Sequence, residues 1–598
     1  MADKLLKRED IDNKYKWDLS AFLGKDGTFE EQLKELLPKI DKLKEFKGQL
    51  SEKAKLLEFF ELNSKLSDKL SRLACYAFQK RDENTQDPTS KANYDKINSA
   101  YVLISMATSF FNPELAALPE EYVKECIEDP EFSNFDLYLK EVLRVKKHTL
   151  SDKEEALLAS GGEVFGAFHD IFSMLDDADL KFGKITGEKG EEVELSHSKY
   201  GALLTSYDRK VRKDAYETYY QSYKDHIRTI AAIYAGNVKK DVFLSNARGF
   251  ENCLQRATFN EDADIRAYQN LLKNVESALP SVHEYVSLRK KVLRVDDIRF
   301  YDLYVSLVEN DSLKVPFEQG YDIVMKALSP LKQDYVDMLK KAKEEGWIDV
   351  FPNIGKRSGA YSNSTYGVHP YVLLNYEKTV HDIFTIAHEM GHAMHSYYSN
   401  EAQVMEKADY TIFVAEVAST VNEVLLLRYL IDNTQDKEMK KFCLNYFLDM
   451  FRTTLFRQTM FAEFEYIAHK LAEENTPITS EVLSDEYEKL NKKYYGEEIV
   501  HDDFIKYEWA RIPHFYRSFY VYKYATGITS AVSIAYDILE NGEESVKKYK
   551  QFLSSGCTKP PVELLKIAGV DLTCDKPFIA ANEIFTKTLE EFKSLMEE

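Results

Sequence analysis

Helical periodicity runs through almost the whole 598-residue chain and constrains its fold more than any other feature. Apolar residues recur every three to four positions in stretches such as FEEQLKELLPKIDKLKEF and SKANYDKINSAYVLISMATSFF. Only 23 glycines and 15 prolines occur in the chain, and both residues disfavour helix interiors. The sequence therefore predicts a mainly α fold, and its length predicts at least two lobes.

Two regions break the helical pattern. Residues 180–196, LKFGKITGEKGEEVELS, contain two short alternating segments around a glycine-bearing turn, which predicts a hairpin. We place a domain boundary there, with an N-terminal helical domain at 1–190 and a second domain at 191–598. Residues 347–376, WIDVFPNIGKRSGAYSNSTYGVHPYVLLNY, are the richest in turn and strand signals and predict a small β-sheet.

Composition excludes several classes of partner. The chain carries 79 lysines and arginines against 100 acidic residues, a net charge of −21, and has no dense basic run, so we expect no nucleic-acid binding. No apolar run approaches the roughly 18 residues of a membrane span, and the charged start MADKLLKREDIDNKYKWD is unlike a signal peptide. Six scattered cysteines without CxxC pairs indicate reduced thiols in a cytoplasmic protein. The oligomeric state stays open.

Residues 385–394, TIAHEMGHAM, place two histidines one helical turn apart. We expect a helix from Thr379 to Tyr398, capped by Thr379 with Asp382 at its third position. On such a helix His388 and His392 can reach one metal ion. Glu389 lies about 100° round the helix from His388, where it can contact a water without binding the metal. Chance predicts only about 0.05 such motifs in this composition.

A catalytic metal site of this kind needs a third ligand. His395 lies about 10 Å along the helix from His388, so we expect it to be packed or hydrogen-bonded instead. Tyr398 stands where the HExxHxxGxxH pattern has its third histidine. Glu416, in the apolar run YTIFVAEVASTVNEVLLL, is the better candidate, because a buried carboxylate needs a cation. The alternative is that it pairs with a lysine or arginine across the core. Glu423, on the same face, could support a ligand histidine.

The motif TIAHEMGHAMHSYYS, with the glutamate of IFVAEVAST 24 residues after the second histidine, resembles the M3 family of zinc oligopeptidases, and within it the oligoendopeptidase F group. The segments KWDLSAFL, GAYSNSTYGVHPYVLLNY and PHFYRSFYVYKYATG are also similar to this group. The resemblance spans essentially the whole chain. It implies that His388, His392 and Glu416 bind one zinc ion and that Glu389 is the catalytic glutamate.

The same resemblance implies a fold and further site residues. The fold is mainly α, with two helical lobes around a deep substrate channel and a small β-sheet beside the HExxH helix. Residues 1–190 correspond to an oligopeptidase F-type N-terminal domain, and residues 191–598 to an M3-type catalytic domain. Related M3 enzymes use a late histidine and tyrosines to stabilise the transition state, a role that we transfer to His514, Tyr516 and Tyr522. The glycines usual in this segment of thimet-type relatives are missing here.

These expectations describe a zinc metalloendopeptidase that cleaves internal bonds of short unstructured peptides. A peptide could pair as an extra strand with YVLLNY at 371–376, and the glycine-bearing loop GKRSGAYS at 355–362 could close over it. One alternative is a zinc carboxypeptidase or dipeptidyl carboxypeptidase on the same scaffold. Another is a catalytically silent peptide-binding protein, although a purely structural zinc site has no use for Glu389.

Overall fold

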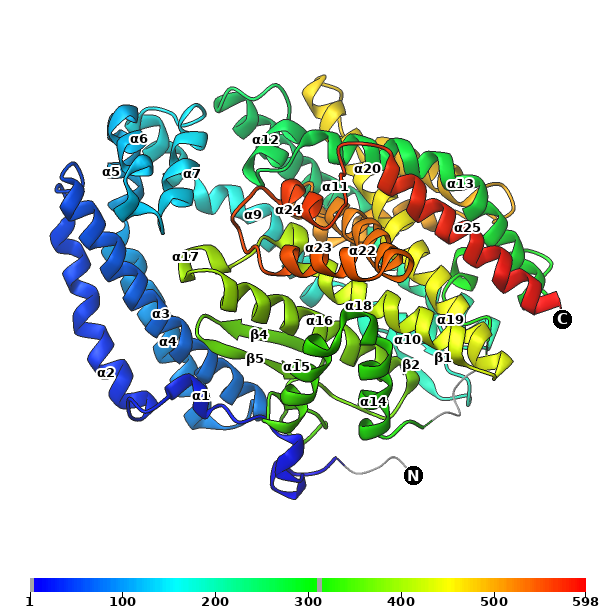
Figure 1. The fold of residues 1–598 in the computed structure, drawn as a ribbon. Coiled ribbons are helices and arrows are strands. Elements are labelled where there is room, and N and C mark those ends of the chain that lie inside the picture. The colour runs from blue at the N-terminus through cyan, green and yellow to red at the C-terminus, as the bar shows by residue number, and fades with distance from the viewer. Residues whose placement is uncertain (1–4, 309–313, 598) are drawn as a thin grey trace. The chain divides into compact units, whose positions relative to one another are not determined.

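A computed structural model describes residues 5–308 and 314–597, and its path is drawn in Figure 1. Most of the described residues lie in helices, as the sequence predicts, and strands are few and short. The chain divides into two compact units that are each assembled from separate segments. Unit 1 contains residues 1–149, 312–426 and 534–569, and unit 2 contains residues 150–311, 427–533 and 570–598. The boundary near residue 190 stays a prediction.

Unit 1 contains the predicted sheet and the helix with the two histidines. Its elements are α1 Ser20–Leu23, α2 Phe29–Ile40, α3 Lys53–Glu83, α4 Pro88–Thr108, α5 Phe111–Ala117, α6 Glu120–Glu128, α7 Asp136–Lys146, α14 Phe317–Ala327, α15 Gln333–Glu344, β3 Ile348–Asp349, β4 Tyr361–Thr365, β5 Val368–Leu373, α16 Val380–Ala402, α17 Met405–Ala408, α23 Glu543–Leu553 and α24 Pro561–Ile567.

Unit 2 is built around two long helices, and the predicted hairpin lies in it. Its elements are α8 Asp152–Ser160, α9 Gly162–Ser173, β1 Lys184–Thr186, β2 Glu192–Glu194, α10 His197–Leu203, α11 Arg209–Ala247, α12 Cys253–Asn260, α13 Ile265–Leu293, α19 Lys437–Met450, α20 Arg457–Glu473, α21 Ser480–Tyr495 and α25 Lys576–Glu597. Helices α18, Ile412–Asn433, and α22, Tyr522–Asn541, each contribute residues to both units.

The three-stranded sheet of unit 1 has the order β3-β5-β4. β5 pairs in parallel with β3 and antiparallel with β4, so both of its edges are occupied. Gly367, with φ +71°, supplies the left-handed residue in the tight connection between β4 and β5. Helix α16 lies beside these two strands (Figure 1). β4 is therefore an edge strand of this sheet, whereas β5 is its central strand.

Tyrosines account for much of the core of unit 2. Tyr216, Tyr219, Tyr220 and Tyr223 follow the helical period on α11, and all four are buried. The hydroxyl of Tyr223 donates to Asp176 at 2.7 Å. The high aromatic content of the sequence therefore serves packing in this helix, with buried hydroxyls that need polar partners.

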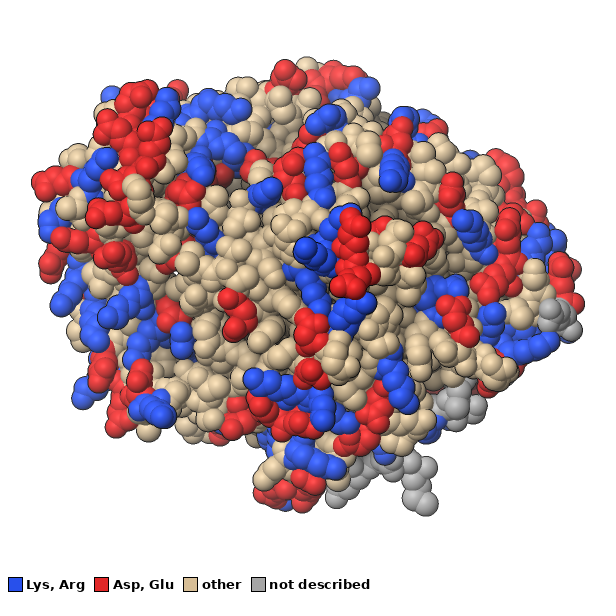
Figure 2. All heavy atoms as spheres, viewed as in Figure 1, with Lys and Arg blue, Asp and Glu red and all other residues tan. Residues whose placement is uncertain are grey.

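Surface charge follows the composition. On the face drawn in Figure 2, lysines and arginines are interspersed with aspartates and glutamates, and no continuous basic stripe is visible. Among the described residues, the helices are too short or too polar for any of them to cross a membrane.

Candidate metal centre

Helix α16 begins where the sequence predicts. The N–H of Asp382 donates to Thr379 Oγ1 at 3.2 Å, and the N–H of Thr379 donates to Asp382 Oδ2 at 2.7 Å. This reciprocal cap satisfies two backbone donors that a helix start leaves free. The helix continues to Ala402, four residues beyond the predicted end. Because the cap sets the first residue of the helix, it also sets the direction in which His388 and His392 project.

A glycine on α16 lets α18 approach closely. The apolar stripe of α16 is buried along its length: Val380, Ile383, Phe384, Ala387, Gly391 and Met394. A Cβ atom on Gly391 would lie 2.5 Å from the Cα of Ser419, so only glycine fits there. Asn422 Nδ2 donates to the Ala387 carbonyl at 3.0 Å and fixes the same crossing. This crossing brings Glu416, three residues before Ser419, to the two histidines.

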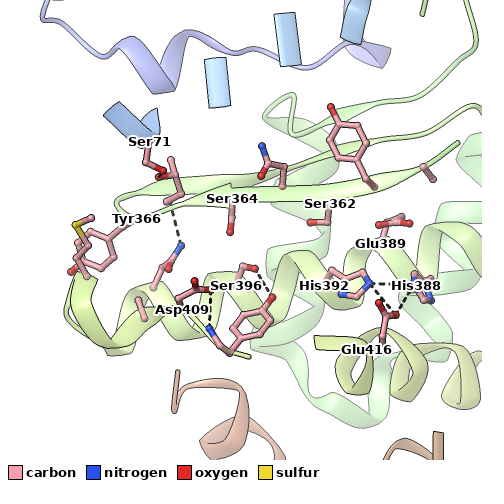
Figure 3. Close-up of a pocket in the computed structure, with 18 residues that line it drawn as sticks. Ser71, Ser362, Ser364, Tyr366, His388, Glu389, His392, Ser396, Asp409 and Glu416 are labelled. Atoms are coloured by element: carbon pink, nitrogen blue, oxygen red, sulfur yellow. Dashed lines mark hydrogen bonds and ion pairs between the residues drawn. The ribbon is translucent and has the colours of Figure 1, made fainter. Parts of the chain in front are cut away.

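Three ligand atoms converge at this crossing (Figure 3). His388 Nε2 and His392 Nε2 are 3.2 Å apart, and Glu416 Oε2 lies 3.5 Å from the first and 3.6 Å from the second. Ligand atoms around a tetrahedral zinc at about 2.1 Å are separated from one another by about 3.4 Å. The observed triangle therefore fits zinc without rearrangement, and two imidazoles with one carboxylate are a donor set typical of catalytic sites.

The environment of Glu416 differs from the expectation. Its side chain is 40% exposed toward the cavity and is not buried among its apolar neighbours. Its ion pairs are with His388 and His392, and within the described parts of the chain it forms none with a lysine or arginine. Burial opposes ionisation of Glu416, but the hydrogen bond and charge of His392 outweigh it and lower its pKa. The carboxylate is thus held in the charged form that a metal ligand requires.

Glu423 holds His388 from behind. His388 Nδ1 donates to Glu423 Oε1 at 2.5 Å, which leaves Nε2 free to face the other ligand atoms. Burial alone would lower the pKa of His388, but the hydrogen bond and charge of Glu423 raise it to about 9. A carboxylate in this position fixes the orientation and tautomer of a ligand histidine. This is the contact that the seven-residue spacing of Glu416 and Glu423 suggested.

Glu389 projects into the same space without joining the triangle (Figure 3). Its side chain lines the cavity with His388 and His392, yet the residue is only 7% exposed. Burial raises the pKa of Glu389. The negative charges of Glu416 and Glu423 raise this pKa further, whereas the two histidines act to lower it. A buried carboxylate with a raised pKa is suited to accept and return a proton.

These side chains line a cavity of about 690 Å³ in unit 1. One wall is a face of α16 with residues four apart, His388, His392, Ser396 and Asn400, and the other wall is β4. The expectation that a peptide pairs with residues 371–376 is wrong, because β5 has a partner on each side. The available strand edge beside the cavity is β4, at residues 361–365.

Two further expectations concern neighbours of the site. His395 is fully buried with its ring stacked 3.8 Å from that of Tyr410, and burial lowers its pKa to about 3, so it is packed as predicted. Side-chain contacts tether the loop before β4, and its closure over a peptide stays a prediction. The side chain of Lys356 is 0% exposed and donates to the Phe351 carbonyl at 2.8 Å, and Arg357 pairs with Asp82 at 3.2 Å.

The late segment lies in unit 2. His514 is exposed, and partial desolvation of its ring, together with the positive charges of Arg457 and Arg517, lowers its pKa. Tyr516 and Tyr522 are 8% and 2% exposed; the role transferred to these three residues stays a prediction. No sequence signal distinguishes Tyr524, which is half-buried and whose hydroxyl lies 3.4 Å from His514 Nε2. These tyrosines differ in how exposed their side chains are, and their spacing along the sequence does not predict this difference.

Comparisons with known proteins agree across the full length. The model of peptidase family M3 matches residues 202–584, and that of oligopeptidase F matches residues 114–182. The chain is 39% identical to oligopeptidase PepF of Bacillus subtilis, covering 100% of this chain and 89% of the relative, and 36% identical to an oligoendopeptidase F homologue of Lactococcus lactis, covering 99% and 98%. The crystal structure of oligoendopeptidase F from Enterococcus faecium superposes with a TM-score of 0.73 at 33% identity, over 95% of this chain and 99% of that one. A solved structure from Chlamydophila abortus gives 0.93 at 34% identity, over 99% and 100%.

Proposed function

Because the chain belongs to peptidase family M3, as a peptidase of the oligoendopeptidase F type, we propose that it is a zinc endopeptidase that cleaves short peptides internally. The observation that carries this proposal is the triangle of His388, His392 and Glu416, with Glu389 facing the same cavity. We assign residues 191–598 to the catalytic domain and residues 1–190 to the N-terminal domain. The match of the M3 model to residues 202–584 supports this division.

Each residue of the site has a distinct task in this proposal. Zinc held by His388, His392 and Glu416 would supply a Lewis acid for the peptide carbonyl and make water easier to deprotonate near neutral pH. Glu389 accepts the proton of the attacking water and returns it to the leaving amine, a transfer for which its raised pKa suits it. Glu423 keeps His388 oriented throughout.

Edge strand β4 supplies a place for the substrate backbone. A peptide that adds to β4 makes main-chain hydrogen bonds that do not depend on its sequence. Such binding suits short extended peptides, whereas a folded protein would first have to unfold at a cost of about 5–15 kcal/mol. We therefore propose peptide substrates without stable structure.

The test is product analysis with zinc-loaded enzyme. We expect internal cleavage of an unstructured peptide of about ten residues, and equal cleavage when its C-terminus is amidated. Cleavage that releases residues only from a free C-terminus would instead identify a carboxypeptidase on the same scaffold. Absence of any hydrolysis, with one zinc bound per chain, would identify a peptide-binding protein.

Glu416→Ala tests the metal assignment independently. Removal of one ligand of three should lower zinc content after dialysis together with activity. Retention of full zinc by this variant would exclude Glu416 as a ligand.

A further inference from the structure

The cavity has two chemically different ends. The metal-ligand triangle and Glu389 lie at one end, and Asp409 lines the wall at the other, on the side of Ser396 and away from His388 (Figure 3). The hydroxyls of Ser396 and Tyr410 are 2.8 Å apart, which fixes the segment that carries Asp409 against α16. Ser396 is eight residues from His388, about 12 Å along the helix. An extended peptide covers that distance in three to four residues.

No cation balances Asp409 within this cavity. Its lining consists of 18 described residues, none of which is a lysine or arginine, and it includes three carboxylates: Glu389, Glu416 and Asp409. The first two have tasks at the metal end. The Asp409 carboxylate accepts only the N–H of Tyr410 at 2.8 Å and forms no ion pair with another described residue.

The nearest basic side chains along the chain are occupied elsewhere. Lys407, two residues before Asp409, pairs with Asp136 at 2.7 Å and donates to the Ser133 carbonyl at 2.7 Å. Arg72, one residue after the lining Ser71, pairs with Asp68 at 3.0 Å. Each carboxylate that these cations neutralise lies outside the cavity lining. The far end of the cavity therefore keeps a negative charge within a protein of net charge −21.

We infer that Asp409 forms a subsite for a positively charged group of the substrate, three to four residues from the cleaved bond. The inference rests on the proposed peptidase function and adds a substrate class to it. The group is either the side chain of a lysine or arginine or the free α-amino group of a peptide that ends there. A glutamate at the same place is disfavoured by repulsion.

The experiment compares matched peptides in which lysine, glutamine or glutamate occupies each position from two to five residues on either side of the cleaved bond. Each peptide is made with a free and with an acetylated N-terminus. Because Asp409 is exposed, we expect lysine to exceed glutamine in kcat/KM by about two- to five-fold at one position, and less at high salt. A preference that survives acetylation identifies the side chain as the cation, and one that needs the free terminus identifies the α-amino group.

Three variants make the result decisive. Asp409→Asn keeps an oxygen for the Tyr410 N–H and should abolish the charge preference while leaving zinc content and the unfolding midpoint unchanged. Asp409→Lys should reverse it in favour of glutamate. Glu401→Gln, which removes one exposed charge near the end of α16 outside the cavity lining, should leave it intact. The inference would be overturned if the lysine-to-glutamine ratio of kcat/KM were equal in wild type and Asp409→Asn at every position. Cleavage of these peptides would still support the proposed function. Absence of cleavage of all peptides would overturn both.

Discussion

Unit 1 contains two clusters of charged side chains that are built on opposite principles. In the first, the fully buried Asp349 pairs with Arg8 at 2.5 Å and with Lys356 at 2.7 Å, so the protein supplies both signs of charge itself. In the second, His388, His392 and Glu416 direct three electron-pair donors at one point. The side chains of the first cluster neutralise one another, whereas the second cluster offers three ligand atoms that could hold a metal ion.

The comparison distinguishes charged side chains that stabilise the fold from charged side chains that are available to bind a ligand. Asp349 lies on β3 and Lys356 in the loop before β4, so their pairing with Arg8 fastens the N-terminal segment to the sheet that borders the cavity. We expect removal of a metal to leave that cluster unchanged. We expect the histidine cluster to contribute less to the stability of the unit than to the binding of a ligand. Four predictions test this division, from the largest expected effect to the smallest.

Glu389→Gln should reduce kcat by about 10²- to 10⁴-fold, because the amide cannot accept the proton of water. Zinc content should remain at one per chain, since no ligand is altered. Steady-state kinetics and metal analysis on the same sample measure both. Turnover near that of wild type with full zinc would remove Glu389 from the mechanism.

Asp349→Asn should lower the free energy of unfolding by about 3–5 kcal/mol, because it leaves the fully buried Lys356 without a counter-charge. Lys356→Met is the matched control and should cost less, because Arg8 still neutralises Asp349. Urea unfolding measures both variants. Zinc bound per folded chain should not change, and a loss of zinc in Asp349→Asn would show that the two clusters are not independent.

Glu423→Gln should weaken zinc binding by about 10- to 100-fold, because the neutral amide orients His388 less firmly and withdraws the charge that supports it. Competition with a chelator gives the affinity. The unfolding free energy of the metal-free variant should stay near that of metal-free wild type. An unchanged affinity would show that α16 alone orients His388.

Acid should reduce the contribution of the Asp349 cluster to the free energy of unfolding. Burial acts to raise the pKa of Asp349, but the charge of Lys356 and the hydrogen bond from Arg8 outweigh it, and the pKa lies below its usual value of about 3.9. A lowered pKa stabilises the folded state above the unfolded-state pKa, and this stabilisation is lost as the pH falls. The difference in unfolding free energy between wild type and Asp349→Asn should therefore narrow as the pH falls below about pH 4. A difference that does not change with pH would contradict the assignment.

Local features of the site were available from the sequence. The cap formed by Thr379 and Asp382, the buried stripe of α16 and the one-turn spacing of His388 and His392 depend on interactions within a few residues along one helix. Helical periodicity and the hairpin at 184–194 also depend on residues that are close together in the sequence. The choice of Glu416 also placed it beside both histidines, although its carboxylate is partly exposed in the cavity and not buried in the apolar run that motivated the choice.

Only the tertiary structure decided which of several equivalent segments faces the site. The sequences of β4 and β5 both predict strands. Only the pairing of β5 with β3 in the folded protein makes β5 the central strand and leaves β4 at an edge. The approach of Glu416 depends on the contact between Gly391 and the α18 backbone, which joins residues 28 positions apart. Asp409 and Tyr524 gave no signal in the sequence, because exposure and charge balance arise from neighbours that are distant along the chain. Periodicity and capping are local and can be predicted, whereas strand order and the partners of a charge are properties of the packed fold.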